Sequence, residues 1–236
     1  MAERLQKIIA QAGLMSRRAA EIAIRDGRIT INGKVAELGA TAGEEDVILI
    51  DGSPIPGREK KAYYMLNKPR GYVCSLHDEA GRRSVRELLP KSAGRLYPVG
   101  RLDIMSEGLL LMTNDGNFAY RVMHPSGCLH KTYRTTVKGS SIREQISRLG
   151  EPFVLDNTEV KAVRVSVLKM ADDKAVIDIT IREGRNRQIR RMCEEAGLKV
   201  LRLTRIAEGS LRLGRLPSGR ARELTPEEIA SVLGEE

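Results

Sequence analysis

The sequence predicts an α+β fold with two unequal domains, and three observations support this. Its 236 residues exceed the usual size of a single domain. Residues 51–61 are rich in Gly, Pro and charge without periodicity, which is typical of a linker. Beyond them, residues 163–167 and 177–181 alternate apolar and polar side chains, as half-buried antiparallel strands do. We therefore expect one domain over residues 1–58 and a larger one over residues 61–236.

The first domain is expected to begin with two short helices. Apolar residues recur at helical spacing over residues 5–12, and Gly13 ends this helix. Ser16 is placed to cap a second helix, which runs to Gly27.

Short strands follow these helices. Residues 28–31 form a strand, and Asn32-Gly33 is a typical tight hairpin turn. Residues 47–50 are four consecutive apolar residues and predict a later strand.

The larger domain is expected to mix strands and helices without a regular repeat. It opens with an apolar strand at residues 63–66. Asn186 can cap a helix that ends at Gly197, and residues 200–203 give a further strand. Thr225 opens a final helix, with a Pro at the first helical position and a Glu three residues after the cap.

The net charge of +9 and the pI near 9.6 favour a polyanionic partner, for which nucleic acid is the usual candidate. Residues 61–236 hold 31 Lys or Arg against 22 acids, which accounts for the whole surplus. No apolar run is long enough to span a membrane, and the N-terminus lacks the features of a secretory signal, so we expect a cytoplasmic protein.

A metal site or a disulfide framework is not expected. Cys74, Cys128 and Cys193 are odd in number and widely separated, without a Cys-x-x-Cys pair. His77, His124 and His130 do not complete a set of ligands.

Asp103 is the candidate nucleophile. It follows the basic turn Gly100-Arg101-Leu102 and precedes the apolar run at residues 109–112, so its backbone can be anchored in the core while its carboxylate faces a cleft. A carboxylate is ionised at neutral pH, which suits a nucleophile. The alternative is an aspartate that only caps a turn.

A cluster of arginines follows the strand at residues 177–181. The cluster consists of Arg182, Arg185, Arg187, Arg190 and Arg191. Glu194 and Glu195 stand four residues after the last two arginines and could pair with them on the helix surface. Alternatively, one arginine reaches Asp103 while the others hold phosphates.

Several motifs, in this order along the chain, carry a resemblance to a known family. They are Asn67-Lys68-Pro69-Arg70-Gly71, Gly100-Arg101-Leu102-Asp103, Met123-His124-Pro125, Lys131-Thr132-Tyr133 and Glu183-Gly184-Arg185-Asn186-Arg187-Gln188-Ile189-Arg190-Arg191-Met192. Nearly the whole chain resembles the bacterial ribosomal RNA pseudouridine synthases of the RsuA/RluB type, and residues 1–50 resemble the S4 RNA-binding module. The resemblance implies a small S4-like (αL) domain followed by a mainly antiparallel-sheet catalytic domain.

The resemblance also implies roles for particular residues. Asp103 would be the catalytic aspartate, Tyr133 would stack on the target base, and Arg190 would pair with Asp103. Leu203 and Arg101 would belong to the uracil pocket. The residues implied to bind RNA are Arg17, Arg18, Arg25, Arg28, Lys34, Arg185 and Arg187. Among the arginines of residues 183–192, Arg185 and Arg187 remain alternatives to Arg190 for the pairing with the aspartate.

The implied reaction detaches uracil from C1′ of its ribose, turns it and reattaches it through C5, and it needs no cofactor. The implied partner is ribosomal RNA, with 23S favoured and 16S the alternative, and a monomer is the default. The rival hypothesis is a non-catalytic protein that binds ribosomal RNA or assists ribosome assembly. Asp103 separates the two, because a phosphate-binding groove has no use for a carboxylate. A metal-dependent nuclease or phosphotransferase would need paired carboxylates, and the adjacent pair Asp172-Asp173 is expected at a hairpin tip.

Overall fold

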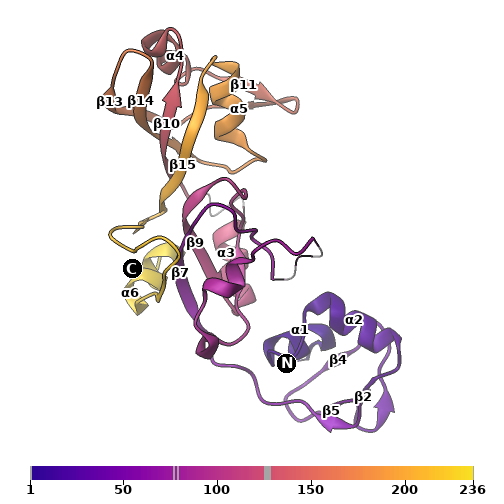
Figure 1. Ribbon diagram of the computed structural model, residues 1–236. Coiled ribbons are helices and arrows are strands. Elements are labelled where there is room, and N and C mark those ends of the chain that lie inside the picture. Colours follow the sequence, from indigo (N-terminus) through magenta and orange to yellow (C-terminus); the bar gives the residue numbers. More distant parts are fainter. Residues whose placement is uncertain (1, 77, 79, 125–128, 236) are drawn as a thin grey trace. The chain divides into compact units, whose positions relative to one another are not determined.

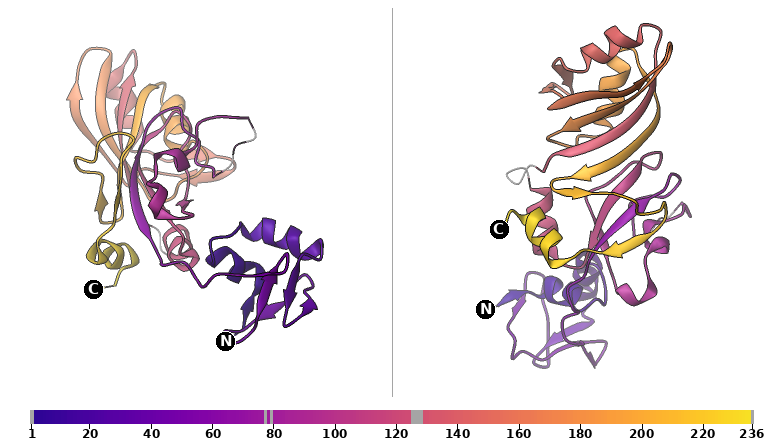
Figure 2. Two further views of the ribbon diagram at one scale, coloured as in Figure 1. Left: turned by 60° about the horizontal axis from the view of Figure 1, so that its bottom comes forward. Right: turned by 90° about the vertical axis from the view of Figure 1, so that its left-hand side faces the viewer.

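The structure is a computed structural model, and it describes residues 2–76, 78, 80–124 and 129–235. The chain divides into two compact units, coloured along the sequence in Figures 1 and 2. The first unit comprises Met1–Ala62 and Ser92–Arg95, and the second comprises Tyr63–Lys91 and Leu96–Glu236. Across the described residues, no helix has both the length and the apolar character to cross a membrane.

The first unit packs two helices against short strands, as predicted. Its elements are β1 (Glu3–Arg4), α1 (Leu5–Gln11), α2 (Arg17–Arg25), β2 (Ile29–Ile31), β3 (Lys34–Val35), β4 (Thr41–Ala42), β5 (Ile48–Ile50) and β6 (Ser53–Pro54). Gly13 has a φ of +76°, which ends α1, and the Ser16 hydroxyl accepts a hydrogen bond from the Ala19 amide at 3.1 Å and so caps α2. Leu5, Ile9 and Ile29 are fully buried in the core of this unit.

The segment predicted as a linker is partly structured. Asp51 and Gly52 adopt positive φ angles of 50° and 79°, and this turn lets β6 pair with β5 in a sheet of order β3-β2-β5-β6. The prediction of a linker from residue 51 was therefore wrong at its start. A two-residue turn with Gly explains why, because the same composition marks both hairpin turns and linkers.

The second unit is built on a nine-stranded sheet (Figures 1 and 2). Its strands are β7 (Tyr63–Lys68), β8 (Tyr97–Val99), β9 (Glu107–Thr113), β10 (Lys131–Lys138), β13 (Arg164–Met170), β14 (Lys174–Ile181), β15 (Lys199–Glu208), β16 (Leu211–Arg212) and β17 (Ala221–Glu223). The order is β13-β14-β10-β15-β9-β7-β17, and β8 and β16 pair with β9 and β15. All pairs are antiparallel except β9 with β15. The predicted class, α+β with a mainly antiparallel sheet, is confirmed.

Helices and a hairpin complete the second unit. They are the 3-10 helix at Val85–Leu88, α3 (Gly116–Met123), α4 (Ile142–Arg148), α5 (Gln188–Glu195), α6 (Pro226–Leu233) and the hairpin of β11 (Phe153–Leu155) and β12 (Thr158–Val160). A second 3-10 turn at Lys91–Ala93 begins at the last residue of this part of the second unit, and its other two residues belong to the first unit. Thr225 caps α6 through a capping box with Glu228, as predicted.

The core of the second unit runs along β9. Leu109, Leu110, Leu111 and Met112 are all fully buried, so both faces of this strand are covered. Leu109 and Leu111 of this strand belong to a core cluster that also contains Phe118 of α3 and Val232 of α6. The chain segment that enters β9 is thereby fixed in space, and that segment contains Asp103.

Candidate active site

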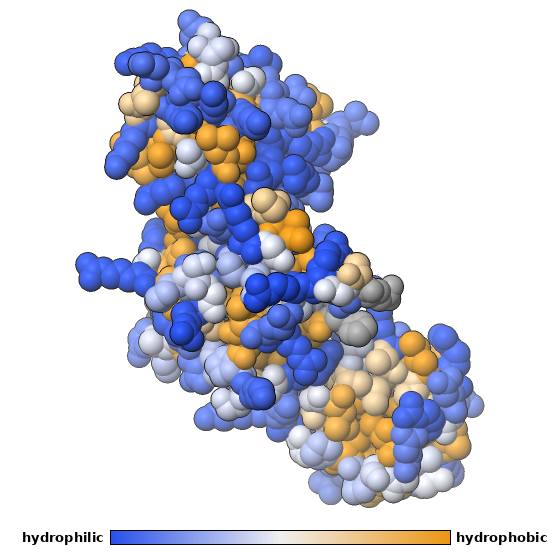
Figure 3. Space-filling model, in the orientation of Figure 1, coloured by the Kyte–Doolittle hydropathy of each residue, from blue (hydrophilic) through white to orange (hydrophobic). Residues whose placement is uncertain are grey.

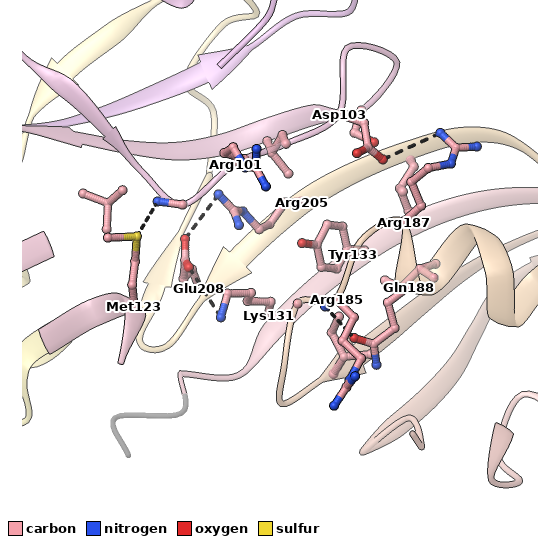
Figure 4. A pocket seen from close by; sticks show the side chains of 18 of the residues that line it. Arg101, Asp103, Met123, Lys131, Tyr133, Arg185, Arg187, Gln188, Arg205 and Glu208 are labelled. Carbon is pink, nitrogen blue, oxygen red and sulfur yellow. Dashed lines mark hydrogen bonds and ion pairs between the residues drawn. The ribbon is translucent and has the colours of Figure 1, made fainter. Parts of the chain in front are cut away.

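A cavity of about 230 Å³ lies in the second unit, between the segment that leads into β9, the strands β10 and β15, and the loop before α5 (Figure 4). Six of the residues predicted for the site line it together, whereas Arg190 is not among the lining residues. The six are Arg101, Asp103, Tyr133, Arg185, Arg187 and Leu203. The cavity is smaller than the ~300–1,000 Å³ of sites for drug-sized ligands, so a ligand of the size of a single base is appropriate.

Asp103 lies on the turn between β8 and β9, and its side chain is 30% exposed. The backbone of this turn is held at both ends. The Ser106 amide donates to the Asp103 carbonyl at 2.9 Å, and the Gly71 amide donates to the Ile104 carbonyl at 2.9 Å. The carboxylate is thus carried by a fixed backbone at the edge of the cavity.

Lys68 binds the backbone of the same turn through its side chain. Its ammonium is fully buried and donates to the carbonyls of Asp103 at 3.1 Å and Ser106 at 2.9 Å, and also to that of Pro69. Burial lowers the pKa of Lys68, while the nearby Cys74, Asp103 and Glu107 act in the opposite direction. A buried cation surrounded by carbonyls has its donors satisfied and holds the turn in one geometry.

Cys74 contacts the residue that precedes Asp103. Its sulfur lies 3.3 Å from both the amide nitrogen and the carbonyl oxygen of Leu102. Burial raises the pKa of this thiol, so it remains protonated and can donate to the carbonyl.

Two arginines lie at the same distance from the Asp103 carboxylate. Arg187 Nη1 and Arg190 Nε are each 3.9 Å from Oδ2. Arg190 is more firmly placed, since its side chain is 14% exposed and Nη2 donates to the Met105 carbonyl at 2.9 Å, whereas Arg187 is 53% exposed. Burial lowers the pKa of Arg190, and the neighbouring Arg187 lowers it further.

The start of α5 differs from the prediction. The residue before the first turn is Arg187, in the left-handed region with a φ of +51°, and not Asn186. The Gln188 side chain accepts a hydrogen bond of 3.1 Å from the Arg185 amide, and this amide of the loop before α5 is thereby satisfied. This backbone turns Arg187 toward the cavity, and local sequence preference does not foresee it because a non-glycine residue seldom adopts this conformation.

The surface pairing considered for this helix is also different. Arg191 makes a two-point contact with Asp156 at 2.7 and 3.0 Å, on the turn between β11 and β12. Its partner is therefore not Glu195, and Arg190 faces Asp103 rather than Glu194. Arg185 lies 3.3 Å from Glu183.

Tyr133 and Leu203 form two buried walls of the cavity, on β10 and β15. Burial raises the pKa of Tyr133, although the positive charge of Arg205 acts against the rise. Arg205 is itself only 2% exposed, and its Nε donates to the Leu109 carbonyl at 2.6 Å. Figure 4 shows Arg205 next to Tyr133 in the cavity.

Arg205, Lys68 and Glu208 were not predicted as site residues. Arg205 is buried where β15 approaches β9 so closely that a Cβ on Gly108 would clash with the Arg205 carbonyl oxygen, and Lys68 is the residue of β7 that pairs with Gly108. Gly108 also has a φ of +104°, so only glycine suits this position. A charged residue in an alternating strand is ordinarily expected to face water, and the sequence offered no signal against that.

The predicted RNA-binding residues of the first unit are all exposed. Arg17, Arg18 and Arg25 lie on α2, and among the described residues none of them makes an ion pair. Lys34 likewise has no acidic partner there, whereas Arg28 pairs with Asp51 on the next strand turn. Figure 3 shows that hydrophilic side chains cover much of the visible face of the second unit.

The described residues contain no group of three or more His, Cys, Asp or Glu side chains that could hold a metal ion. Of the residues considered as ligands in the sequence, His77 and Cys128 lie outside the described residues, as does Pro125 of the Met123-His124-Pro125 motif.

Comparison with protein families gives two matches. The RNA pseudouridylate synthase family matches residues 62–195, and the S4 domain family matches residues 3–48.

Comparison with individual proteins agrees. The chain is 42% identical to the ribosomal large subunit pseudouridine synthase B of Bacillus subtilis, over 96% of this chain and 94% of that protein. It is 38% identical to the protein of the same name from Vibrio cholerae, over 97% of this chain and 74% of that protein. A crystal structure of a pseudouridylate synthase superposes with a TM-score of 0.67 at 32% identity, covering 97% of this chain and 99% of the other.

Proposed function

Since the chain belongs to the RNA pseudouridylate synthase family, we propose that it converts one uridine of 23S ribosomal RNA to pseudouridine, with Asp103 as the nucleophile. The observation that carries the proposal is the position of the Asp103 carboxylate at the rim of a cavity of base size. The names of the Bacillus and Vibrio relatives, both synthases of the large ribosomal subunit, favour 23S over 16S RNA.

The cavity supplies what the isomerisation needs. The N1–C1′ bond between uracil and its ribose must break, the base must turn, and C5 must form the new bond to C1′. The hydrogen on C5 leaves as a proton and N1 takes up a proton, so the overall reaction is an isomerisation. A base outside the RNA stack loses its neighbours, at a cost of a few kcal/mol, and Tyr133 offers a face that offsets part of this. Leu203 would close the other side of the base.

The charges near Asp103 suit the same step. Arg190 and Arg187 place positive charge 3.9 Å from the carboxylate, on the side of the arginine-rich loop and α5. The exposed Arg101 and Arg187 stand at the cavity, where RNA phosphates would approach, and Arg185 lies half-buried beside them. We assign the S4-like residues 1–58 to RNA binding and residues 61–236 to catalysis.

The deciding experiment is pseudouridine mapping of 16S and 23S RNA by carbodiimide modification and primer extension. Cells carrying the intact protein are compared with cells carrying Asp103→Asn. One stop in 23S RNA that the variant loses is the expected result, with RNA affinity of the purified variant within a few-fold of the intact protein. A lost stop in 16S RNA would move the target to the small subunit, and no lost stop would favour the non-catalytic rRNA-binding hypothesis.

A further inference from the structure

Glu208 is a buried carboxylate at the cavity that the reaction as described does not use. It is 2% exposed, and among the described residues its Oε2 atom has no hydrogen-bond partner. Arg205 Nη2, 3.4 Å away, is likewise buried without a hydrogen bond. Arg205 Nε donates to the Leu109 carbonyl, but Glu208 Oε2 and Arg205 Nη2 form an ion pair without a hydrogen bond, which is costly in a buried place unless a ligand completes it.

A β-bulge brings Glu208 to the cavity. Tyr133 pairs with Arg205 and Thr132 pairs with Ala207, so Ile206 is an extra residue on β15. Without it, strand alternation would place Glu208 on the face opposite Arg205. With it, both side chains share the face that lines the cavity, which is a common effect of bulges at functional sites.

The position of Glu208 is opposite that of the candidate nucleophile. In Figure 4, Tyr133 lies between Asp103 on one side and the pair of Arg205 and Glu208 on the other. Lys131 is the second cation beside Glu208: its Nζ lies 3.8 Å from Oε1, whereas Arg205 lies near Oε2. The cavity thus presents an acceptor flanked by two cations at its far end.

Uracil has the complementary pattern. Its reacting atoms N1, C6 and C5 occupy one side of the ring, and the opposite side carries the N3–H donor between two carbonyl oxygens. We propose that Glu208 accepts a hydrogen bond from N3–H of the target uracil while Arg205 Nη2 donates to a neighbouring carbonyl oxygen. Cytosine has a lone pair at N3, which the carboxylate repels, so the pair selects uracil.

This inference rests on the proposed function and deepens it. A site that satisfies its buried groups only with the correct ligand discriminates strongly against an analogue that lacks the donor. The alternative is that Arg205 and Glu208 only stabilise the end of β15. That role predicts a change in thermal stability but none in the preference between bases.

The test uses a hairpin RNA that carries the mapped uridine and a second hairpin with cytidine at that position. Binding is measured by fluorescence anisotropy at fixed salt with the full chain bearing Asp103→Asn, so that no turnover occurs. We expect this protein to bind the uridine hairpin at least about 10-fold more tightly than the cytidine hairpin. Adding Glu208→Gln should reduce the preference to less than about 3-fold, because a carboxamide accepts from uracil N3–H or donates to cytosine N3.

Glu223→Gln is the matched control. Glu223 accepts a hydrogen bond of 2.6 Å from the Tyr64 hydroxyl and does not line the cavity, so this substitution should leave the preference between the two hairpins unchanged. If Glu208→Gln does not fold, Glu208→Asp keeps the charge, shortens its reach and should also lose the preference. A full preference in a folded Glu208 variant would overturn this inference alone. Absence of pseudouridine formation by the intact protein would instead overturn the proposed function.

Discussion

The Asp103 carboxylate and the Arg190 guanidinium lie 3.9 Å apart, and Arg190 Nη2 donates a hydrogen bond to the Met105 carbonyl on the turn that carries Asp103. Arg187 is equally close to the carboxylate but is far more exposed. The two arginines are thus equally distant from the carboxylate, but only Arg190 is mostly buried and hydrogen-bonded to the turn that carries it.

This difference predicts different kinetic effects. Arg190→Gln should lower kcat by about 100-fold or more, as expected for a preorganised charge beside a reacting group. Arg187→Gln should mainly raise KM, since an exposed cation contributes to RNA attraction. Release of tritium from RNA labelled at C5 of uridine measures both constants. Equal losses of kcat in the two variants would show that the fixation of Arg190 carries no catalytic advantage.

Lys68 provides a second prediction, since its ammonium binds the carbonyls of the Asp103 turn. Lys68→Met should lower kcat strongly with little change in RNA affinity, and it should also lower the melting temperature. Each buried carbonyl left without a donor costs about 1–3 kcal/mol. The control is Lys138→Met, which removes an exposed lysine paired with Asp173 at a hairpin end. Unchanged turnover in folded Lys68→Met would exclude a positioning role.

Local signals in the sequence predicted much of the fold. The caps Ser16 and Thr225 were found because a cap depends on neighbours within four residues. Asn186 failed as a cap because the loop places Arg187 in the left-handed region instead. The strand predicted at residues 200–203 is longer in the structure and covers Lys199–Glu208. The prediction was too short because register shifts interrupt the alternation of apolar and polar residues along the strand.

The candidate site was predictable only in part. Asp103 and Tyr133 were found through motifs and lie together in the cavity. Arg205 and Glu208 were not, because their burial depends on contacts between β15 and strands distant in sequence, and a bulge sets the direction of Glu208. Burial of charge by tertiary packing leaves no local pattern for sequence analysis to detect.

The third prediction concerns pH and α6. A hydrogen bond from Arg222 lowers the pKa of Glu228 below its usual value near 4.5, with two contacts of 2.6 and 2.7 Å. The folded state therefore holds this proton less tightly than the unfolded state, so the pair stabilises the fold above about pH 4.5 and its contribution is lost as the pH falls through the lowered pKa.

Glu228→Gln isolates this charge, because Gln can still accept from the Thr225 amide in the capping box. For a partly exposed pair we expect a loss of about 0.5–1 kcal/mol at pH 7, or a few degrees in Tm. The difference in Tm should shrink toward zero below about pH 4 in thermal melts followed by circular dichroism. A constant difference across this range would mean that the carboxylate charge does not contribute.

The last prediction separates the RNA contacts of the first unit from those of the second. Arg17, Arg18 and Arg25 are exposed on α2 without acidic partners in the described part of the chain, so each is available to a phosphate. Replacing all three with Gln should weaken RNA binding and reduce the slope of log K against log salt by about 2, since each phosphate contact contributes about 0.7–0.9.

Arg28→Gln is the control, because Arg28 is already paired with Asp51 and its replacement should change the slope less. Since residues 61–236 supply the whole net charge, most of the slope should remain in the triple variant. An unchanged slope would remove α2 from the RNA interface, whereas its complete loss would place all the phosphate contacts there.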